Sequence, residues 1–333
     1  MRPRVWMERR LADAALARLE AVADVIAGGD MAQLPGVDAV IVSSIPRIDG
    51  AFMDRVGPSL KVVARPGIGV DNIDIPAATE RGILVINTPE GPTESTAEHA
   101  VALLLALSKR VVLGDRQLRG EDIARSELLG TEARGRTLGV VGFGRIGRRV
   151  AEICALGLKM RVLAYDPYAD PAQAKALGVE LVSDLDELLR QADFVTLHPA
   201  LTPETYHLIG ERELHLMKRG AYLINVSRGP VVDEAALIRV LEEGHLAGAA
   251  LDVFDPEPPS PDNPLLRMRR VVATPHIGSF TDLGLARMGE GVVDQLLQIF
   301  RGERPTHLLN PEAWPGRIAA AADRGVAAGT MPD

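Results

Sequence analysis

Short apolar runs, each followed by an amphipathic helical stretch, place the strongest constraint on how this chain folds. The runs consist of Val, Ile, Leu and Ala without polar alternation, which is typical of strands buried on both faces of a parallel sheet. Helical stretches between such runs predict βαβ units and doubly wound α/β sheets. Strands are expected at residues 4–7, 39–43, 61–64, 83–86, 137–141, 160–165, 194–198, 221–226, 247–251 and 271–274.

Two long helical stretches interrupt this rhythm and indicate the domain organisation. A chain of 333 residues exceeds the size at which a single core stops growing, so two domains are expected. Ser95-Thr96-Ala97-Glu98 has the pattern of a capping box that opens an apolar helix through Leu107. A second long helix is expected over residues 281–300. We interpret both as connectors, with domain 95–283 inserted into a discontinuous domain formed by 1–94 and 284–333. The tail from Gly316 is rich in Ala, Gly and Pro and is expected to be poorly ordered.

Charge and cysteine content exclude several classes of partner. The net charge of −8 argues against a nucleic-acid partner, because such a surface needs basic residues to neutralise phosphates. The longest apolar run, 100–107, is far shorter than the roughly 20 residues that span a membrane. A single cysteine, Cys154, excludes an intrachain disulfide and fits a reducing compartment. We therefore expect a cytoplasmic protein without nucleic-acid or membrane partners.

A glycine-rich turn identifies a dinucleotide site. Gly142, Gly144 and Gly147 form G-x-G-x-x-G directly after a predicted strand and at the start of a helix. The helix N-terminus presents unpaired N–H groups to the pyrophosphate. Asp166 ends the next predicted strand, where a carboxylate accepts from ribose hydroxyls and repels a 2′-phosphate. The pattern favours NAD as cofactor, although Arg145 could face the adenosine side and leaves NADP open.

Three charged residues at successive strand ends fit the reduction of a 2-oxo acid. That reaction needs a cation for the carboxylate and carbonyl, a proton donor, and a negative charge that keeps the donor protonated. Arg228, His276 and Glu257 supply these three functions in that order. An arginine suits the first function because its planar fork binds a carboxylate in two places. The other histidines show no metal-ligand spacing, so no metal is expected.

The sequence resembles the D-isomer-specific 2-hydroxyacid dehydrogenase family over residues 37–312. The matching motifs are PGIGVDNID (66–74), NTP (87–89), the glycine turn (142–147), NVSRGPVVDE (225–234), ALDVFDPEP (250–258) and TPHIG (274–278). The resemblance implies an α/β fold in which a Rossmann NAD-binding domain is inserted into a flavodoxin-like substrate domain. It also implies a homodimer.

The resemblance assigns functions to individual residues. Arg228 would bind the substrate and His276 would act as acid and base with Glu257 as its partner, while the backbone at Ile68 and Gly69 would hold the substrate carboxylate. The cofactor contacts would be Gly142, Gly144, Arg145, Ile146, Gly147, Asp166, Pro199, Thr205, Val226, Asp252 and Gly278. Of these, Asp252 would accept from the nicotinamide carboxamide.

The substrate remains open between several small acids. Phosphoglycerate enzymes of the family place an arginine after the early strand that reads Val40-Ile41-Val42 here, where this chain has Ser43 and Ser44. The expected substrate is therefore an unphosphorylated acid such as hydroxypyruvate or glyoxylate, with 3-phosphoglycerate as the alternative and Arg65 as a possible anion contact. An NAD-binding corepressor is an alternative of another class. A formate-type oxidase is disfavoured because that branch has glutamine where this chain has Glu257.

Overall fold

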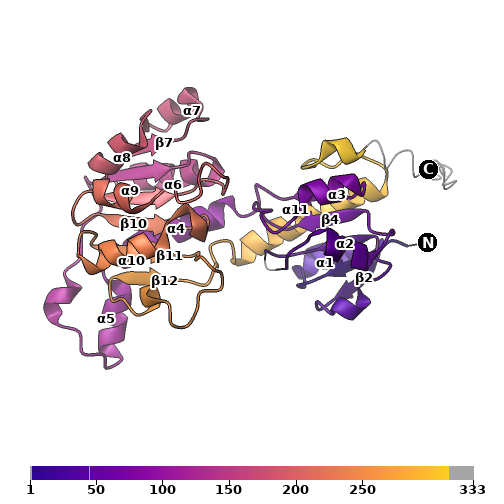
Figure 1. Cartoon of the computed structure of the whole chain (residues 1–333). Helices are drawn as coiled ribbons and strands as arrows, with labels where there is room; N and C mark the ends of the chain where they lie inside the picture. The colour runs from indigo at the N-terminus through magenta and orange to yellow at the C-terminus, as the bar shows by residue number, and fades with distance from the viewer. Residues whose placement is uncertain (1, 45, 315–333) are drawn as a thin grey trace. The chain divides into compact units, whose positions relative to one another are not determined.

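The computed structural model describes residues 2–44 and 46–314 and divides into two compact units (Figure 1). The first unit is formed by the chain up to Pro92 and by the chain from Asp282 onward, and the second is Thr93–Thr281. Both boundaries lie two residues from those expected. The segment from Gly316, which is expected to be poorly ordered, lies outside the described residues.

The first unit is built on a parallel five-stranded sheet in the order β2-β1-β3-β4-β5. This is the flavodoxin-like order. Its strands are β1 (Arg4–Met7), β2 (Asp24–Ala27), β3 (Ala39–Ile41), β4 (Val62–Arg65) and β5 (Leu84–Asn87). Its helices are α1 (Asp13–Glu20), α2 (Gly50–Val56), α3 (Ile75–Glu80) and α11 (Asp282–Phe300), with short 3-10 turns η1 (Met31–Gln33) and η5 (Pro311–Ala313).

Successive side chains of these strands enter cores on opposite faces of the sheet. Val5 and Met7 pack with α1 and α11, whereas Trp6 packs with α2 and α3 on the other face. The Trp6 ring is almost fully buried, and its indole N–H donates to the Asp30 carbonyl at 3.0 Å. Burial on both faces explains why these strands read as continuous apolar runs.

The second unit contains a parallel seven-stranded sheet in the order β12-β11-β10-β9-β6-β7-β8, which is a Rossmann order with one added strand. Its strands are β6 (Thr137–Val141), β7 (Arg161–Tyr165), β8 (Glu180–Leu181), β9 (Phe194–Leu197), β10 (Tyr222–Asn225), β11 (Gly248–Leu251) and β12 (Val271–Ala273). Its helices are α4 (Thr93–Ser108), α5 (Val111–Leu118), α6 (Arg145–Leu156), α7 (Pro171–Ala176), α8 (Leu185–Gln191), α9 (Glu211–Leu216) and α10 (Glu234–Glu242). The 3-10 turns are η2 (Arg125–Leu128), η3 (Gly229–Val231) and η4 (Pro264–Leu266). The predicted α/β class with two parallel sheets is confirmed.

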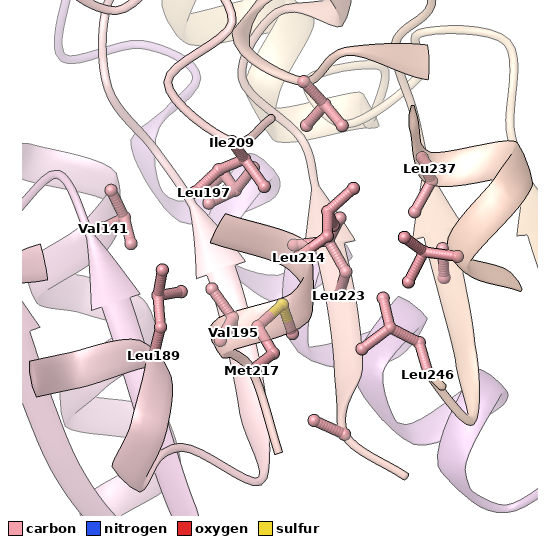
Figure 2. Packing of buried hydrophobic residues seen from close by; sticks show 14 of the residues in the cluster. Val141, Leu189, Val195, Leu197, Ile209, Leu214, Met217, Leu223, Leu237 and Leu246 are labelled. Atoms are coloured by element: carbon pink, nitrogen blue, oxygen red, sulfur yellow. The ribbon is translucent and has the colours of Figure 1, made fainter. Parts of the chain in front are cut away.

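The second sheet also has a core on each face. Figure 2 shows one of them, where Leu197 and Leu223 from the strands meet Leu214 and Leu237 from the helices. The opposite face packs against α4 and α6, and Cys154 on α6 is fully buried there. Burial raises the pKa of the Cys154 thiol to about 12, as expected of a cysteine that serves as a small apolar side chain.

Two strands and one helix start differ from the sequence-based expectations. The predicted set omits β2 and β8, which lie at sheet edges and carry exposed or half-buried residues. The predicted capping box is wrong, because α4 begins at Thr93 and Ser95 lies inside it. The Ser95 hydroxyl instead pairs with the Thr281 hydroxyl at 2.7 Å. Among the described helices, none is long and apolar enough to cross a membrane.

Candidate active site

The glycine turn lies at the topological switch point of the second sheet, between β6 and β9. Gly142 follows β6 with φ of +88°, a conformation that favours glycine. A Cβ on Gly142 would lie 2.6 Å from the Pro199 nitrogen and 2.7 Å from the His198 carbonyl carbon. The strand-to-helix turn therefore runs directly against the chain that leaves β9.

The other two glycines shape a cradle at the start of α6. A Cβ on Gly147 would lie 2.0 Å from the Gly142 carbonyl oxygen, so only glycine allows this close approach. A Cβ on Gly144 would meet no atom within 4 Å, so the space beside the helix start is open. Arg145 and Ile146 begin α6 after this glycine, at a helix end whose first N–H groups have no intrahelical acceptor. The cradle fits a pyrophosphate.

Asp166 connects the end of β7 to this cradle. Its Oδ2 accepts from the Phe143 N–H at 2.8 Å, and its Oδ1 accepts from the Tyr168 N–H at 2.9 Å. A carboxylate oxygen can accept more than one hydrogen bond, so both oxygens retain capacity for ribose hydroxyls. The residues present therefore fit an NAD-type dinucleotide.

The remaining predicted cofactor contacts also follow strand ends of the second unit. Pro199 and Thr205 follow β9, and Thr205 Oγ1 donates to the Ala200 carbonyl at 2.6 Å. Val226 follows β10, and Gly278 follows β12. The carboxyl ends of parallel strands meet at one sheet edge, which gathers these residues there. Their contacts with a cofactor remain predictions.

The structure brings Glu257 and His276 together. Glu257 lies in the loop after β11, His276 lies three residues after β12, and His276 Nδ1 is 2.5 Å from Glu257 Oε1. Both side chains are partly exposed. A carboxylate at this distance accepts a hydrogen bond from the Nδ1 side of the ring and orients it. It also leaves Nε2 as the ring nitrogen that can face a substrate.

A strained backbone turn carries His276, and Asp252 holds that turn. His276 has φ of +53°, which is uncommon for a residue other than glycine. The His276 N–H donates to the Asp252 carbonyl at 2.8 Å. The N–H groups of Ile277 and Gly278 donate to the Asp252 carboxylate at 2.9 and 2.8 Å. These three hydrogen bonds fix the conformation from which His276 projects.

The Asp252 carboxylate is itself buried and almost fully satisfied. Thr274 Oγ1 donates to its Oδ1 at 2.6 Å, and His99 Nε2 lies 3.3 Å from the same oxygen. Burial acts to raise the pKa of Asp252, but hydrogen bonds from His99, Thr274 and Ile277 together lower that pKa below its ordinary value. The observed function of Asp252 is to hold the His276 turn, and its contact with a nicotinamide carboxamide remains a prediction.

A half-buried carboxylate, Glu234, holds the loop that carries Glu257. Glu234 Oε1 accepts from the Asp255 N–H at 2.7 Å, and its Oε2 accepts from Asn263 Nδ2 at 3.0 Å. Burial is the main reason why the pKa of Glu234 is raised. No catalytic or binding function was expected for Glu234 or Asn263, although Glu234 closes the 225–234 motif.

Arg228 follows β10, whose end lies beside those of β11 and β12. Asn225 pairs in register with Leu251, and Leu251 pairs with Ala273, so the three strands end at the same level (Figure 1). Asn225 Nδ2 donates to the Arg228 carbonyl at 2.9 Å, and Arg228 Nη1 donates to the Ser227 carbonyl at 2.6 Å.

The loops beyond these strands are also in contact. A Cβ on Gly229 would lie 2.0 Å from the Phe254 carbonyl oxygen, so the backbone of the Arg228 loop packs directly against the loop after β11. The structure thus places Arg228, Glu257 and His276 on adjoining loops of one sheet edge.

The predicted substrate backbone belongs to the first unit, in the loop after β4. Asn87 Nδ2 donates to the Ile68 carbonyl at 2.8 Å, and Arg65 Nε donates to the Gly69 carbonyl at 3.2 Å. Arg65 Nη1 also donates to the Pro66 carbonyl at 2.5 Å. Arg65 therefore contributes to holding its own loop, and the possible anion contact remains untested.

Within residues 2–44 and 46–314, no three His, Cys, Asp or Glu side chains group as a metal site.

Two parallel sheets, a glycine cradle at a switch point and a carboxylate–histidine pair define a dinucleotide-dependent oxidoreductase class. The family described as "D-isomer specific 2-hydroxyacid dehydrogenase, NAD binding domain" matches residues 101–278, which is more than half of the chain. The chain belongs to this NAD-dependent family.

Relatives with two different names resemble the chain in sequence. A glyoxylate reductase of Korarchaeum cryptofilum is 43% identical over 326 residues, which cover 94% of this chain and 97% of that protein. A D-3-phosphoglycerate dehydrogenase of Archaeoglobus fulgidus is 44% identical over 270 residues, which cover 81% of this chain and 51% of that protein. The chain therefore spans about half the length of this phosphoglycerate dehydrogenase.

Solved structures of similar proteins cover nearly the whole chain. The TT0316 protein from Thermus thermophilus has a TM-score of 0.84 and 42% identity, covering 92% of this chain and 99% of that chain. A D-lactate dehydrogenase from Aquifex aeolicus, complexed with NAD and lactic acid, has a TM-score of 0.80 and 32% identity, and it also covers 92% of this chain and 99% of that chain.

The Asp252 network generates a prediction for Thr274. Thr274→Val keeps the side-chain shape but removes the hydroxyl donor from a buried carboxylate, so the free energy of unfolding should fall by about 1–2 kcal/mol at pH 7. A carboxyl whose pKa is lowered on folding stabilises the protein above its unfolded pKa, and this stability is lost as pH falls through the folded pKa. Loss of one stabilising hydrogen bond should therefore move that acid-induced loss to higher pH.

Urea denaturation between pH 3 and pH 7 measures both effects of the Thr274 change. Thr274→Ser retains the hydroxyl and is the matched control, for which stability close to that of the unmodified protein is expected. Equal stability of the Val and Ser variants at every pH would contradict the proposed hydrogen-bond contribution.

Proposed function

We propose that this chain is an NAD-dependent dehydrogenase that interconverts a small 2-oxo acid and its D-2-hydroxy acid. The observation that carries the proposal is the 2.5 Å contact between Glu257 and His276, at the sheet edge that also carries the glycine cradle. NADH, when bound, supplies the hydride that reaches carbon 2 of the acid.

The protein residues bind the substrate and move the proton. The Arg228 guanidinium binds the acid and polarises its carbonyl, which stabilises the negative charge that develops on the oxygen. His276 Nε2 donates a proton to that oxygen during reduction and accepts it during oxidation. Glu257 stabilises the protonated ring through Nδ1. The backbone N–H groups at Ile68 and Gly69 hold the substrate carboxylate.

The preferred substrates are hydroxypyruvate and glyoxylate. Ser43 stands where a phosphate-binding arginine is expected, which favours an unphosphorylated acid. D-3-Phosphoglycerate is the second candidate, because relatives of both names resemble the chain. Steady-state NADH turnover on a panel of 2-oxo acids tests the activity and separates it from a corepressor, which would bind NADH without turnover.

The Glu257–His276 pair generates a prediction about catalysis. Glu257→Gln keeps a hydrogen-bonding group beside His276 Nδ1 but removes the negative charge, so kcat for reduction should fall by about tenfold or more. His276→Asn should remove most activity, because no proton donor remains. Steady-state rates at one fixed pH, with NADH affinity as the control, check both. An unchanged kcat in Glu257→Gln would exclude Glu257 as the partner of His276.

The Asp166 carboxylate generates a prediction about the coenzyme. NADH should be preferred over NADPH, because a 2′-phosphate is repelled by Asp166. Asp166→Ser should narrow the ratio of kcat/KM values by about tenfold, which corresponds to about 1.4 kcal/mol. Asp170→Asn removes a nearby charge, retains a residue suited to cap α7 and should leave the ratio unchanged. Faster turnover of the unmodified protein with NADPH would refute the assignment.

The homodimer implied by the family has a candidate surface on the second unit. Leu118 at the end of α5 and Leu129 after η2 are 89% and 81% exposed. Burial of an exposed leucine against another chain removes apolar surface from water, which stabilises an assembly. Sedimentation equilibrium should give about twice the chain mass of 35.7 kDa. The double change Leu118→Asp and Leu129→Asp should give a monomer, whereas Val22→Asp on the first unit should not. A monomeric unmodified protein would reject the dimer.

A further inference from the structure

A carboxylate lies at the topological switch point of the first sheet. In the order β2-β1-β3-β4-β5 the connections change direction between β1 and β3, and ligands of such sheets bind outside the carboxyl ends of the strands at that point. Glu8 follows β1 and Ser43 follows β3 by two residues. Glu8 Oε2 accepts from the Ser43 N–H at 2.7 Å, so the side chain bridges the switch point.

Several contacts fix the position of this carboxylate. The Glu8 N–H donates to the Ile41 carbonyl at 3.0 Å, which extends the pairing of β1 with β3 by one residue. Asn72 Nδ2 donates to the carbonyls of Ser43 and Pro46 at 3.0 and 2.8 Å, which fixes the opposite loop. The Glu8 side chain is only 21% exposed.

Among the described residues, Arg9 is the ion-pair partner of Glu8, and it compensates the charge of Glu8 only weakly. The Arg9 guanidinium lies 3.9 Å from Glu8 Oε1 and is 63% exposed, so water screens it. The next arginine, Arg10, pairs instead with Asp13 at 3.0 Å. The sheet edge at β1 and β3 therefore presents a fixed negative charge.

This charge lies on the strand pair next to the loop assigned to the substrate carboxylate. Ile41 at the end of β3 pairs with Ala64 on β4, so the loops that carry Ser43 and Gly69 leave neighbouring strands at the same edge. A small acid is only two or three carbons long. If its carboxylate is held at Gly69, the whole acid lies at this edge of the sheet, where Glu8 bridges to the loop that carries Ser43.

We propose that Glu8 is a specificity-determining residue that excludes acids with a phosphate or a second acidic group at the far end. A second anion near a partly buried carboxylate is repelled with little water to screen the charges. A hydroxyl group can instead donate to Glu8 Oε1. The inference rests on the proposed function and narrows its substrate class to monoanionic 2-oxo acids, with a neutral end as in hydroxypyruvate and glyoxylate.

The test compares kcat/KM for hydroxypyruvate and 3-phosphohydroxypyruvate. The unmodified protein should prefer hydroxypyruvate. Glu8→Gln keeps an acceptor for the Ser43 N–H but removes the charge, so the ratio should shift toward the phosphorylated acid by about tenfold or more. Ser43→Arg should shift the ratio in the same direction. Glu20→Gln removes an exposed charge from α1 in the same unit and is the matched control, for which no shift is expected.

A binding measurement separates this inference from the proposed function. The NADH-loaded protein is titrated calorimetrically with D-glycerate and with 3-phospho-D-glycerate. The unmodified protein should bind D-glycerate and not 3-phospho-D-glycerate, whereas the Glu8→Gln variant should bind both acids. If no 2-oxo acid is turned over but this pattern holds, the proposed function fails and the Glu8 inference stands. If turnover occurs but Glu8→Gln leaves the substrate ratio unchanged, or if the unmodified protein prefers the phosphorylated acid, the Glu8 inference is overturned. Failure of the protein to bind either acid overturns it as well.

Discussion

One buried carboxylate, Asp252, fixes the geometry on which the proposed chemistry depends. A buried charge is costly unless donors surround it, and Asp252 satisfies this requirement with Thr274 and two backbone N–H groups of the following turn. The same bonds that make the buried carboxylate tolerable hold His276 in an uncommon backbone conformation. The same hydrogen bonds therefore serve both stability and the geometry of His276, because the buried Asp252 carboxylate is stable only when the N–H groups of this turn point toward it.

The parallel sheet makes this arrangement possible. Since β10, β11 and β12 end in register, the loops that carry Arg228, Glu257 and His276 leave the sheet at one level. Glu234 then holds the Glu257 loop by accepting from Asp255 and Asn263. Each charged residue thus projects from a loop that a second polar residue supports, which satisfies the general need for a rigid shell around a catalytic group.

The sequence predicts those parts of the fold that depend on local pattern. Ten strands, the glycine turn and the charged residues at strand ends follow from apolar runs and from residue types whose chemistry is specific. The edge strands β2 and β8 lack a continuous apolar run, since an edge is only partly covered. Ser95 has the local pattern of a helix cap, but its hydroxyl pairs with Thr281, which is 186 residues away. The contacts of His99 and Glu234 likewise join distant segments, and no local pattern records them.

The two sheets use the same topological rule with opposite chemistry. At the switch point between β6 and β9, glycines remove side chains, so that backbone N–H groups and a helix start face the open space. At the switch point between β1 and β3, Glu8 fills the corresponding position with a carboxylate that consumes the Ser43 N–H. The first arrangement attracts a pyrophosphate, and the second repels any similar group. The strand order alone fixes the two switch points, so the side chain placed at each switch point decides which anion that sheet accepts. A chain with glycines at one switch point and a glutamate at the other can bind a phosphate-rich cofactor while rejecting a phosphorylated substrate.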